Sequence, residues 1–251
     1  MLIQLTRREI RSRFIGSSAG WLWLIVNPLL ILGVYSIVFG VIFNARAPTG
    51  LDMPFVAWLA LALWPWLGFS EGIMRASESM PEHAGLISKV PMRRELLVLS
   101  SATASFALQL AGYLAVLLLM AALGIPLTPA GVPNALLVLA VLLLLCNALG
   151  LVAATLRVFF SDLQQILPTL MMLWFFLTPI LYAPELLPDH FQALVYANPL
   201  AGLMTDLRAA LLEGQVIPGA TTLVMLVVSA GLYAVGLIFF RRMAPYFEDF
   251  L

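Results

Sequence analysis

One short stretch of the sequence matches a pattern that is typical of a catalytic nucleophile. Residues 68–72 read Gly-Phe-Ser-Glu-Gly, the G-x-S-x-G pattern that marks a serine hydrolase when it lies on a turn between a strand and a helix. Here the five residues lie inside a long apolar run, and the two histidines, His83 and His190, fall in predicted loops on opposite sides of a membrane. A nucleophilic Ser70 would lack a base within reach. We therefore expect no catalytic residue, and an intramembrane serine hydrolase is the alternative from another class.

Nucleotide, disulfide and metal chemistry have no recognisable pattern in this sequence. It holds no GxxxxGK[ST] motif, whose backbone amides would cradle phosphates, so energy for transport or any other driven process must come from another chain. The single cysteine, Cys146, excludes an intrachain disulfide. With 13 basic and 13 acidic residues, the formal net charge of zero gives no attraction to nucleic acid. We expect no cofactor and no metal in this chain.

Composition places the chain in a membrane. Hydrophobic residues make up 62% of the sequence and charged residues 10%, against about 45–50% and 25% in soluble domains. A bilayer core takes about 20 apolar residues per helix, and every backbone group within it needs an internal partner. We therefore predict an all-α polytopic membrane protein with six transmembrane helices, roughly at residues 21–43, 54–75, 96–123, 134–157, 166–182 and 218–240.

The distribution of basic residues predicts the orientation. Six spans put both termini on one side, and nearly all Lys and Arg residues fall on that side, leaving Arg46 and Arg208 on the other. Because basic residues near span ends are retained in the cytoplasm, we predict that both termini are cytoplasmic. The outward connections are then residues 44–53, 125–133 and 183–217.

The first residues predict a basic amphipathic helix before the first span. On a helical wheel residues 2–15 show one apolar side, although Leu5 and Ile15 fit it poorly; the apolar side holds Leu2, Ile3, Ile10 and Phe14. Such a helix lies along the inner leaflet with its cations at headgroup level, a role predicted here for Arg7, Arg8, Arg11 and Arg13. The alternative, that these arginines simply fix topology, fits equally well.

The second span and the loop after it hold further charged residues. Glu71 and Arg75 have the i,i+4 spacing of a helical ion pair, and we expect them to pair with each other. In the loop, Pro81 suits the first position of a helix and Glu82 the positive end of its dipole, which predicts a short helix from Pro81 to Lys89. Such a helix can dock a soluble partner or simply connect two spans.

The long outer segment, residues 183–217, predicts two short helices. They are separated at Asn198-Pro199, because a proline disfavours helix in the residue before it. The second helix has an apolar face at helical spacing, with Asp206, Arg208 and Glu213 elsewhere and Gly214 as a stop; the face is formed by Leu200, Leu203, Met204, Leu207 and Leu211. The two helices either dip into the outer membrane face or form a surface hairpin.

Aromatic residues concentrate in the predicted spans. Pro65 and Pro179 are placed to bend the helices that carry most of them, which include Trp58, Trp64, Trp66, Trp174, Phe175 and Phe176. In a cavity such rings offer flat apolar faces on which sugars stack, whereas against lipid or neighbouring helices they are packing.

Five segments occur in a characteristic order along the chain. They are RREIRSRFIGSSAGWLWLIVNPLL, GLISKVPMRRELLVLS, FFSDLQQILPTLMMLWFFLTPILY, NPLAGLMTDLRAALLEG and the FEDFL tail. Together they resemble the membrane subunit of ABC exporters for bacterial surface polysaccharides, the O-antigen, teichoic-acid and capsule permeases, over nearly the whole chain. One departure is Arg93-Arg94-Glu95, where many O-antigen-type members have Pro before Arg-Glu.

The resemblance implies one exporter domain over residues 1–251. Its parts would be an interfacial helix (1–18), spans one to five (21–182), periplasmic gate helices (183–216), span six (218–240) and a cytoplasmic tail (241–251). It also implies a homodimer in the bacterial inner membrane, with two copies of a cytoplasmic ATPase that would hold ATP and Mg²⁺. The substrate would be a lipid-linked polysaccharide, most of all O-antigen; the alternative is the same architecture exporting capsule, teichoic acid, drug or lipid.

The resemblance further assigns roles to particular residues. The coupling helix to the ATPase would contain Pro81, Glu82, His83, Gly85, Leu86 and Lys89. The periplasmic gate would consist of helices Pro184–Tyr196 and Pro199–Leu212, with Asn198, Pro199, Asp206 and Arg208. The substrate path would be lined by Tyr35, Trp58, Trp64, Trp66, Trp174 and Phe175.

Overall fold

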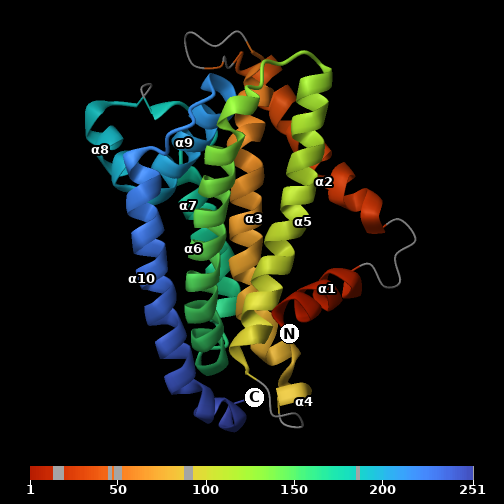
Figure 1. The fold of residues 1–251 in the computed structure, drawn as a ribbon, viewed down its shortest axis with the longest axis vertical. Coiled ribbons are helices and arrows are strands. Elements are labelled where there is room, and N and C mark those ends of the chain that lie inside the picture. Colours follow the sequence, from red (N-terminus) through yellow and green to blue (C-terminus); the bar gives the residue numbers. More distant parts are fainter. Residues whose placement is uncertain (14–19, 45–46, 48–52, 88–92, 185–186, 251) are drawn as a thin grey trace.

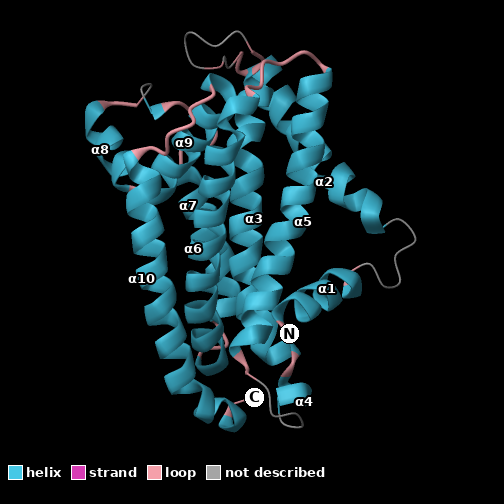
Figure 2. Ribbon diagram, in the orientation of Figure 1, coloured by secondary structure: helices cyan, strands magenta, loops and turns pink. Residues whose placement is uncertain are grey.

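The chain is helical, without strands, in the part that the computed structural model describes, which is all of it except residues 14–19, 45–46, 48–52, 88–92, 185–186 and 251 (Figure 2). This confirms the predicted all-α class. The α-helices are α1 (Leu2–Ser12), α2 (Gly20–Tyr35), α3 (Phe55–Glu82), α4 (Ala84–Ile87), α5 (Glu95–Ala122), α6 (Val132–Phe159), α7 (Leu163–Leu177), α8 (Asp189–Ala197), α9 (Pro199–Glu213) and α10 (Ala220–Met243). A π-helix, η1 (Ser36–Ile42), extends α2, and 3-10 segments η2 (Pro129–Gly131) and η4 (Ala244–Asp249) precede α6 and follow α10.

Four helical stretches are long and apolar enough to cross a membrane: α3, α5, η2 with α6, and α10 with η4. Two shorter apolar stretches, Leu29–Ile42 and Leu163–Leu177, overlap the first and fifth predicted runs. With 15 residues α7 is about 22 Å long, less than the roughly 30 Å of a hydrocarbon core. The polytopic membrane fold is confirmed, and six as the number of spans stays a prediction.

Both termini lie at one end of the helical bundle, and α8 and α9 lie at the other (Figure 1). We call these the inner end and the outer end. Because the two termini lie at the same end, the chain crosses the membrane an even number of times if its helices span it. The cytoplasmic location of the inner end stays a prediction.

The contacts of α3 with α5 and α6 form the core of the bundle, and α10 packs on α6. α3 is buried on nearly every face, whereas α10 shows most of its apolar surface to the outside. Small residues let α3 and α6 approach closely: a Cβ atom on Gly72 would lie 2.5 Å from the Sγ atom of Cys146, and one on Gly150 would lie 2.8 Å from the Cβ atom of Ala76. Close packing of this kind is a main attraction between helices in a membrane.

A proline inside α3 deprives one carbonyl of its helical partner. Pro65 has no N–H, so the carbonyl of Leu61, four residues earlier, cannot accept the usual hydrogen bond. The buried Tyr113 of α5 donates its hydroxyl to this oxygen across 2.9 Å. Since a membrane core holds no water to pair a free carbonyl, Tyr113 supplies the partner that Pro65 lacks.

The outer end confirms the predicted break between two helices. α8 ends before Asn198 and α9 begins at Pro199, and the five apolar residues of the predicted α9 face, Leu200, Leu203, Met204, Leu207 and Leu211, are all buried. Gly214 ends α9 in the left-handed region, with φ +71°. The first helix begins at Asp189 rather than at Pro184, because Pro188 disfavours helical backbone in the residue before it. Whether the pair dips into the membrane stays a prediction.

The inner connection after α3 differs from the predicted short helix. α3 continues through Pro81 to Glu82, and a separate helix, α4, covers Ala84–Ile87 up to the last described residue before position 88. Pro81 therefore lies in the last turn of α3 and not in the first turn of a new helix. The turn is stabilised instead at His83, whose backbone N–H donates to the carbonyl of Met80 and whose Nδ1 atom lies 2.9 Å from the carbonyl of Ser79.

Candidate functional site

The six aromatic residues predicted to line a substrate path lie in two clusters and one separate position. Tyr35 and Trp58 belong to a chain of neighbouring rings that also includes Phe39 and Phe55, with centroids 5.8–6.1 Å apart. Trp66 of α3 contacts Trp174 and Phe175 of α7, at 6.2 and 5.9 Å. Trp64, only 1% exposed, takes part in neither cluster.

Exposure divides the same six residues. Trp58, Trp64 and Trp66 are buried within the chain, whereas Tyr35, Trp174 and Phe175 keep partly exposed side chains. The partly exposed rings can contact a molecule outside the chain, and Trp66 packs against two of them, Trp174 and Phe175.

Asn198 joins the start of α9 to the end of α7. Its side-chain oxygen accepts hydrogen bonds from the Trp174 indole N–H and the Leu200 backbone N–H, both at 3.1 Å. Its amide nitrogen donates to the carbonyl of Leu177 at 3.1 Å and to the hydroxyl of Thr178 at 3.0 Å. One side chain thus caps α9, holds the exposed end of α7 and fixes the Trp174 ring.

Arg208 is buried, although its sequence position suggested the polar side of α9. The side chain is 7% exposed. Its guanidinium lies 3.5 Å from the ring centroid of Trp58 and donates to three backbone carbonyls; these belong to Trp58 at 3.3 Å, Pro179 at 2.8 Å and Ile180 at 3.1 Å. The polar side of α9 is covered because α9 packs on α3 and on the turn after α7. Burial lowers the pKa of Arg208 to about 9, which leaves the guanidinium charged at neutral pH.

Asp206 has a separate role at the start of α10. Its carboxylate accepts hydrogen bonds from the backbone N–H of Thr222 at 3.2 Å and from the Thr222 hydroxyl at 2.6 Å. A carboxylate at the beginning of a helix also interacts favourably with the helix dipole. Asp206 and Arg208, both predicted as gate residues, therefore fasten α9 to two different neighbours, α10 and the end of α7.

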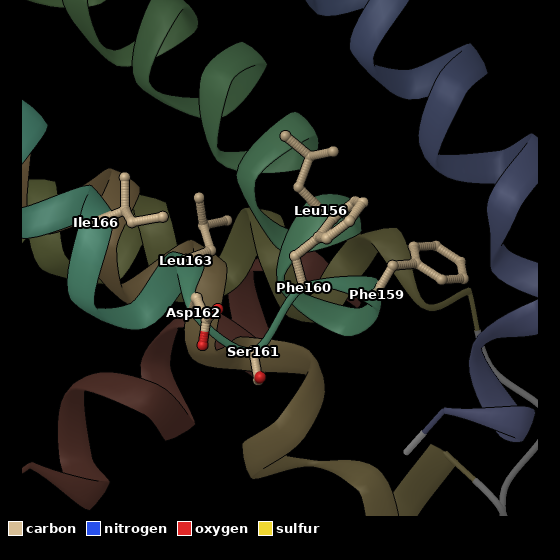
Figure 3. Close-up of a pocket in the computed structure, with 7 residues that line it drawn as sticks. All are labelled: Leu156, Phe159, Phe160, Ser161, Asp162, Leu163 and Ile166. Atoms are coloured by element: carbon tan, nitrogen blue, oxygen red, sulfur yellow. The ribbon is translucent and has the colours of Figure 1, made fainter.

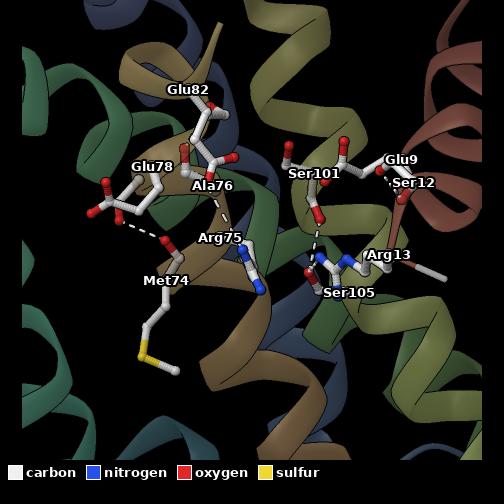
Figure 4. Close-up of polar contacts among 12 residues, drawn as sticks. Glu9, Ser12, Arg13, Met74, Arg75, Ala76, Glu78, Glu82, Ser101 and Ser105 are labelled. Atoms are coloured by element: carbon white, nitrogen blue, oxygen red, sulfur yellow. Dashed lines mark hydrogen bonds and ion pairs between the residues drawn. The ribbon is translucent and has the colours of Figure 1, made fainter. Parts of the chain in front are cut away.

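Arg13 is separated from the other three arginines of the N-terminal segment. Arg7, Arg8 and Arg11 are exposed. Arg13 instead donates to the carboxylate of Glu71 at 2.9 Å, with a side chain only 16% exposed. It also donates to the hydroxyl of Ser105 (Figure 4). A cation in a poorly solvated position is stabilised by a carboxylate partner. The prediction that all four arginines share the membrane surface is corrected for Arg13.

Glu71 also departs from its expected partner. Its second oxygen accepts a hydrogen bond from Gln109 at 2.6 Å, while Arg75 lies 3.7 Å from Glu82. Glu71 lies seven residues further into the bundle than Glu78, about 10 Å along α3. We call Arg13, Glu71, Ser105 and Gln109 the polar cluster; it connects α1, α3 and α5.

The packed side of α1 agrees in part with the predicted apolar side. Leu2 packs against the core of the bundle and Ile10 is partly buried, whereas Ile3 is 83% exposed and Phe14 lies outside the described residues. Leu5, which fitted the wheel poorly, is also partly buried. The polar cluster determines this orientation, since Arg13 can reach Glu71 only when its side of the helix faces the bundle. α1 itself ends at Ser12.

The predicted coupling residues lie at the inner end, around the end of α3 and in α4. Glu82 is half-exposed beside Arg75, and Gly85 lies in α4. Leu86 lies in α4 as well, whereas Lys89 lies outside the described residues. Nearby, Glu78 of α3 pairs with Arg157 of α6 at 3.1 Å, and Arg157 also donates to Gln164 at 3.0 Å.

A cavity of about 470 Å³ opens at the inner end, in the turn between α6 and α7 (Figure 3). Asp162, the N-cap residue of α7, and Ser161 supply its polar atoms. Its other lining residues are Leu156, Phe159, Phe160, Leu163 and Ile166. The largely apolar lining suits contact with another apolar group more than binding of a charged ligand.

Two chemical alternatives can be compared with the geometry. Ser70 is buried in the middle of α3, so the G-x-S-x-G residues form part of a helix and not a strand-to-helix turn. Among the residues that the structure describes, no three His, Cys, Asp or Glu side chains converge as metal ligands would.

Sequence reasoning missed the partners of Arg13. Ser101, Ser105 and Gln109 recur every four residues in a largely apolar predicted span and therefore lie on one side of α5. Polar residues aligned within a predicted span indicate an internal polar contact. This signal identifies the side of α5 but not Glu71 as the partner.

Comparison with known proteins adds a family to this geometry. Residues 2–212 match the family model described as ABC-2 type transporter. The chain is 31% identical to the O-antigen export system permease protein RfbA of Myxococcus xanthus, over 90% of this chain and 85% of the relative. Identity to RfbA of Klebsiella pneumoniae is 26%, over 85% and 81%. Identity to the polysialic acid transport protein KpsM of Escherichia coli is 25%, over 90% and 89%.

Proposed function

Because the chain belongs to the ABC-2 type transporter family, we propose that it is the permease subunit of an ATP-driven exporter of a lipid-linked polysaccharide, most of all O-antigen. The observation that carries this proposal is the 31% identity to an O-antigen export permease across 90% of the chain. The permease would move its substrate outward through the bacterial inner membrane. It would neither form nor break a covalent bond of the glycan.

Two copies of the chain and two copies of a cytoplasmic ATPase would form the working exporter. A separate ATPase is supported by two observations. The sequence has no phosphate-binding loop of its own, and the chain belongs to a transporter family. ATP and Mg²⁺ would be held by the ATPase. The end of α3 with α4 would dock that subunit, at the inner end of the bundle where both termini also lie.

The substrate path would run along the partly exposed aromatic residues. Tyr35, Trp174 and Phe175 offer flat faces on which sugar rings stack, and stacking tolerates a change of sugar as a long glycan slides past. Arg7, Arg8 and Arg11 would face anionic headgroups, including the pyrophosphate of a lipid-linked substrate. α8 and α9 would gate the outer end.

Deleting the gene and complementing it tests the export function. We expect loss of surface polysaccharide and accumulation of lipid-linked glycan inside the cell, both reversed by the wild-type gene. Unchanged surface polysaccharide would overturn the proposal. Identification of the missing glycan separates O-antigen from capsule or teichoic acid, and a change only in drug sensitivity would favour a drug exporter.

Two substitutions test the assigned roles. Glu82→Lys should raise the ATP hydrolysed per glycan exported, while Glu213→Lys, which makes the same change on an exposed residue of the outer end, should not. Ser70→Ala should leave export intact. Loss of a proteolytic activity in that variant would instead support the hydrolase alternative.

A further inference from the structure

We propose that the C-terminal tail, residues 244–250, is a positioning element for energy coupling. It fastens the start of α5, the helix that leaves the ATPase-docking loop, to the end of α10. We call the contacts of Arg94 and Glu95 with Arg241, Ala244 and Glu248 the tail clasp. The inference rests on the proposed function, because it takes the loop between α3 and α5 as the site where the ATPase acts.

Two ion pairs of opposite polarity form the clasp. Arg94 donates to the carboxylate of Glu248 and to the backbone carbonyl of Ala244. The next residue, Glu95, accepts from Arg241 through Nε at 3.0 Å and Nη2 at 2.7 Å. Since adjacent residues of α5 carry opposite charges and so do their partners, a shift of the tail would bring like charges together. The clasp therefore sets one position of the tail along α5.

Aromatic packing holds the tail in place behind these ion pairs. Phe247 is fully buried and makes edge contacts with Phe240 of α10 at 5.2 Å and with Phe159 of α6 at 5.9 Å. Phe250 contacts Phe159 as well, at 4.9 Å. The tail thus joins three helices at the inner end: α5 by charge, and α6 and α10 by ring contacts.

The docking loop is consequently anchored at both ends. Before the loop, Glu78 of α3 pairs with Arg157 of α6. After the loop, Arg94 and Glu95 are held by α10 and the tail. A push on a loop anchored in this way is transmitted to α6 and α10 as well as to α3 and α5. Without the clasp, the start of α5 could turn independently of α10. Part of the movement that the ATPase imposes on the docking loop would then not reach α10.

The exposure of the clasp separates this role from a purely structural one. Glu248 is 57% exposed and Arg94 20%. Exposed ion pairs contribute little to folding stability, so variants of this pair should still fold and assemble. Their effect should appear in the ratio of ATP hydrolysed to glycan exported.

The test uses the full permease co-purified with its ATPase and reconstituted in phosphatidylethanolamine–phosphatidylglycerol vesicles for ATP hydrolysis. Surface polysaccharide is measured in the complemented deletion strain. Glu248→Arg should raise the ratio of ATP hydrolysis to surface polysaccharide several-fold, with unchanged co-purification of the ATPase. The charge exchange Arg94→Glu with Glu248→Arg should restore the ratio. Rescue by charge exchange is not expected if Glu248 merely supports folding.

Neighbouring residues give matched controls. Asp249→Arg and Arg93→Glu make the same charge changes on exposed side chains one position away from the clasp, and each should leave the ratio unchanged. If Glu248→Arg fails to co-purify with the ATPase, Glu248→Gln carries the test, compared with Asp249→Asn. The inference is overturned if the Glu248 variant behaves like its Asp249 control, or if both single variants assemble and the exchange restores nothing.

The proposed docking role and the clasp can fail separately. If Glu82→Lys uncouples ATP hydrolysis and the Glu248 variants do not, the clasp is rejected and the docking loop stands. If neither changes coupling, the docking assignment is rejected, and the clasp with it.

Discussion

The indole nitrogen of Trp174 donates a hydrogen bond to the side-chain oxygen of Asn198 across 3.1 Å, and this contact joins the proposed substrate path to the first turn of α9. The same asparagine caps α9 through Leu200 and binds the end of α7 through Leu177 and Thr178. A ring that contacts the glycan would therefore be oriented by a residue of the outer gate. Movement of α9 would turn the ring as well.

Removal of either partner should weaken the same contact. Trp174→Phe keeps an aromatic ring but loses the N–H donor and part of the ring area, at a cost of about 1–2 kcal/mol. Asn198→Ala also loses the helix cap and should cost about 1–2 kcal/mol. The double variant should cost less than the sum, measured by unfolding in mixed micelles, and each variant should lower surface polysaccharide. Additive costs would disprove the coupling between Trp174 and Asn198. The control is Trp23→Phe, which makes the same change at an exposed tryptophan.

Arg208 should tolerate no replacement, including lysine. Lysine keeps the charge but cannot reach three carbonyls and a ring face with one planar group. Arg208→Lys should cost about 1–3 kcal/mol, because carbonyls of Pro179 and Ile180 would be left unpaired. Arg242→Lys, on an exposed residue of α10, should be close to neutral. Equal stability of the two variants would refute the role of the buried guanidinium.

The polar cluster should behave as one unit. Glu71→Ala leaves the Arg13 guanidinium without its carboxylate, and because the two side chains are 16% and 31% exposed we expect a loss of about 1–2 kcal/mol. Adding Arg13→Ala should cost little more. A double-mutant cycle measured by unfolding in micelles checks the coupling. Arg11→Ala, on an exposed residue of the same helix, should have no such coupling to Glu71.

A tight contact between α3 and α6 predicts a compensating pair of substitutions. Gly72→Ala would place a methyl group 2.5 Å from the Sγ atom of Cys146 and should destabilise the bundle by about 1–3 kcal/mol. Cys146→Ala removes the sulfur, so the double variant should regain most of this loss. Gly33→Ala, where nothing lies within 4 Å, is the matched control. A double variant no more stable than Gly72→Ala would contradict this packing.

Most of the fold follows from local patterns in the sequence. Long apolar runs predict the membrane helices, because hydrocarbon requires internal pairing of the backbone. The proline at position 199 separates α8 from α9, and the spacing of five apolar residues predicts the buried face of α9. These features depend on residues close together in the chain, which makes them visible without a structure.

Contacts between distant residues could not be predicted in the same way. Glu71 has Arg75 at ideal helical spacing, yet its partner is Arg13, 58 residues away, because packing brings α1 against α3 and α5. Helical spacing put Arg208 away from the apolar face of α9, yet its guanidinium is buried: the turn after α7 supplies two carbonyl acceptors and Trp58 of α3 supplies the third. The spacing of residues along a helix indicates which neighbouring side chains could form an ion pair. The packing of the helices against one another determines which pairs form.

The hydrogen bond from Tyr113 to Leu61 has a consequence for biosynthesis. α3 leaves the ribosome before α5, so during insertion the carbonyl opposite Pro65 faces hydrocarbon with no donor until Tyr113 arrives. Association of α5 with α3 removes an unpaired polar group from lipid, which favours this pairing over other early contacts. The Leu61 carbonyl therefore gains the partner that Pro65 denies it only when α5 has packed on α3.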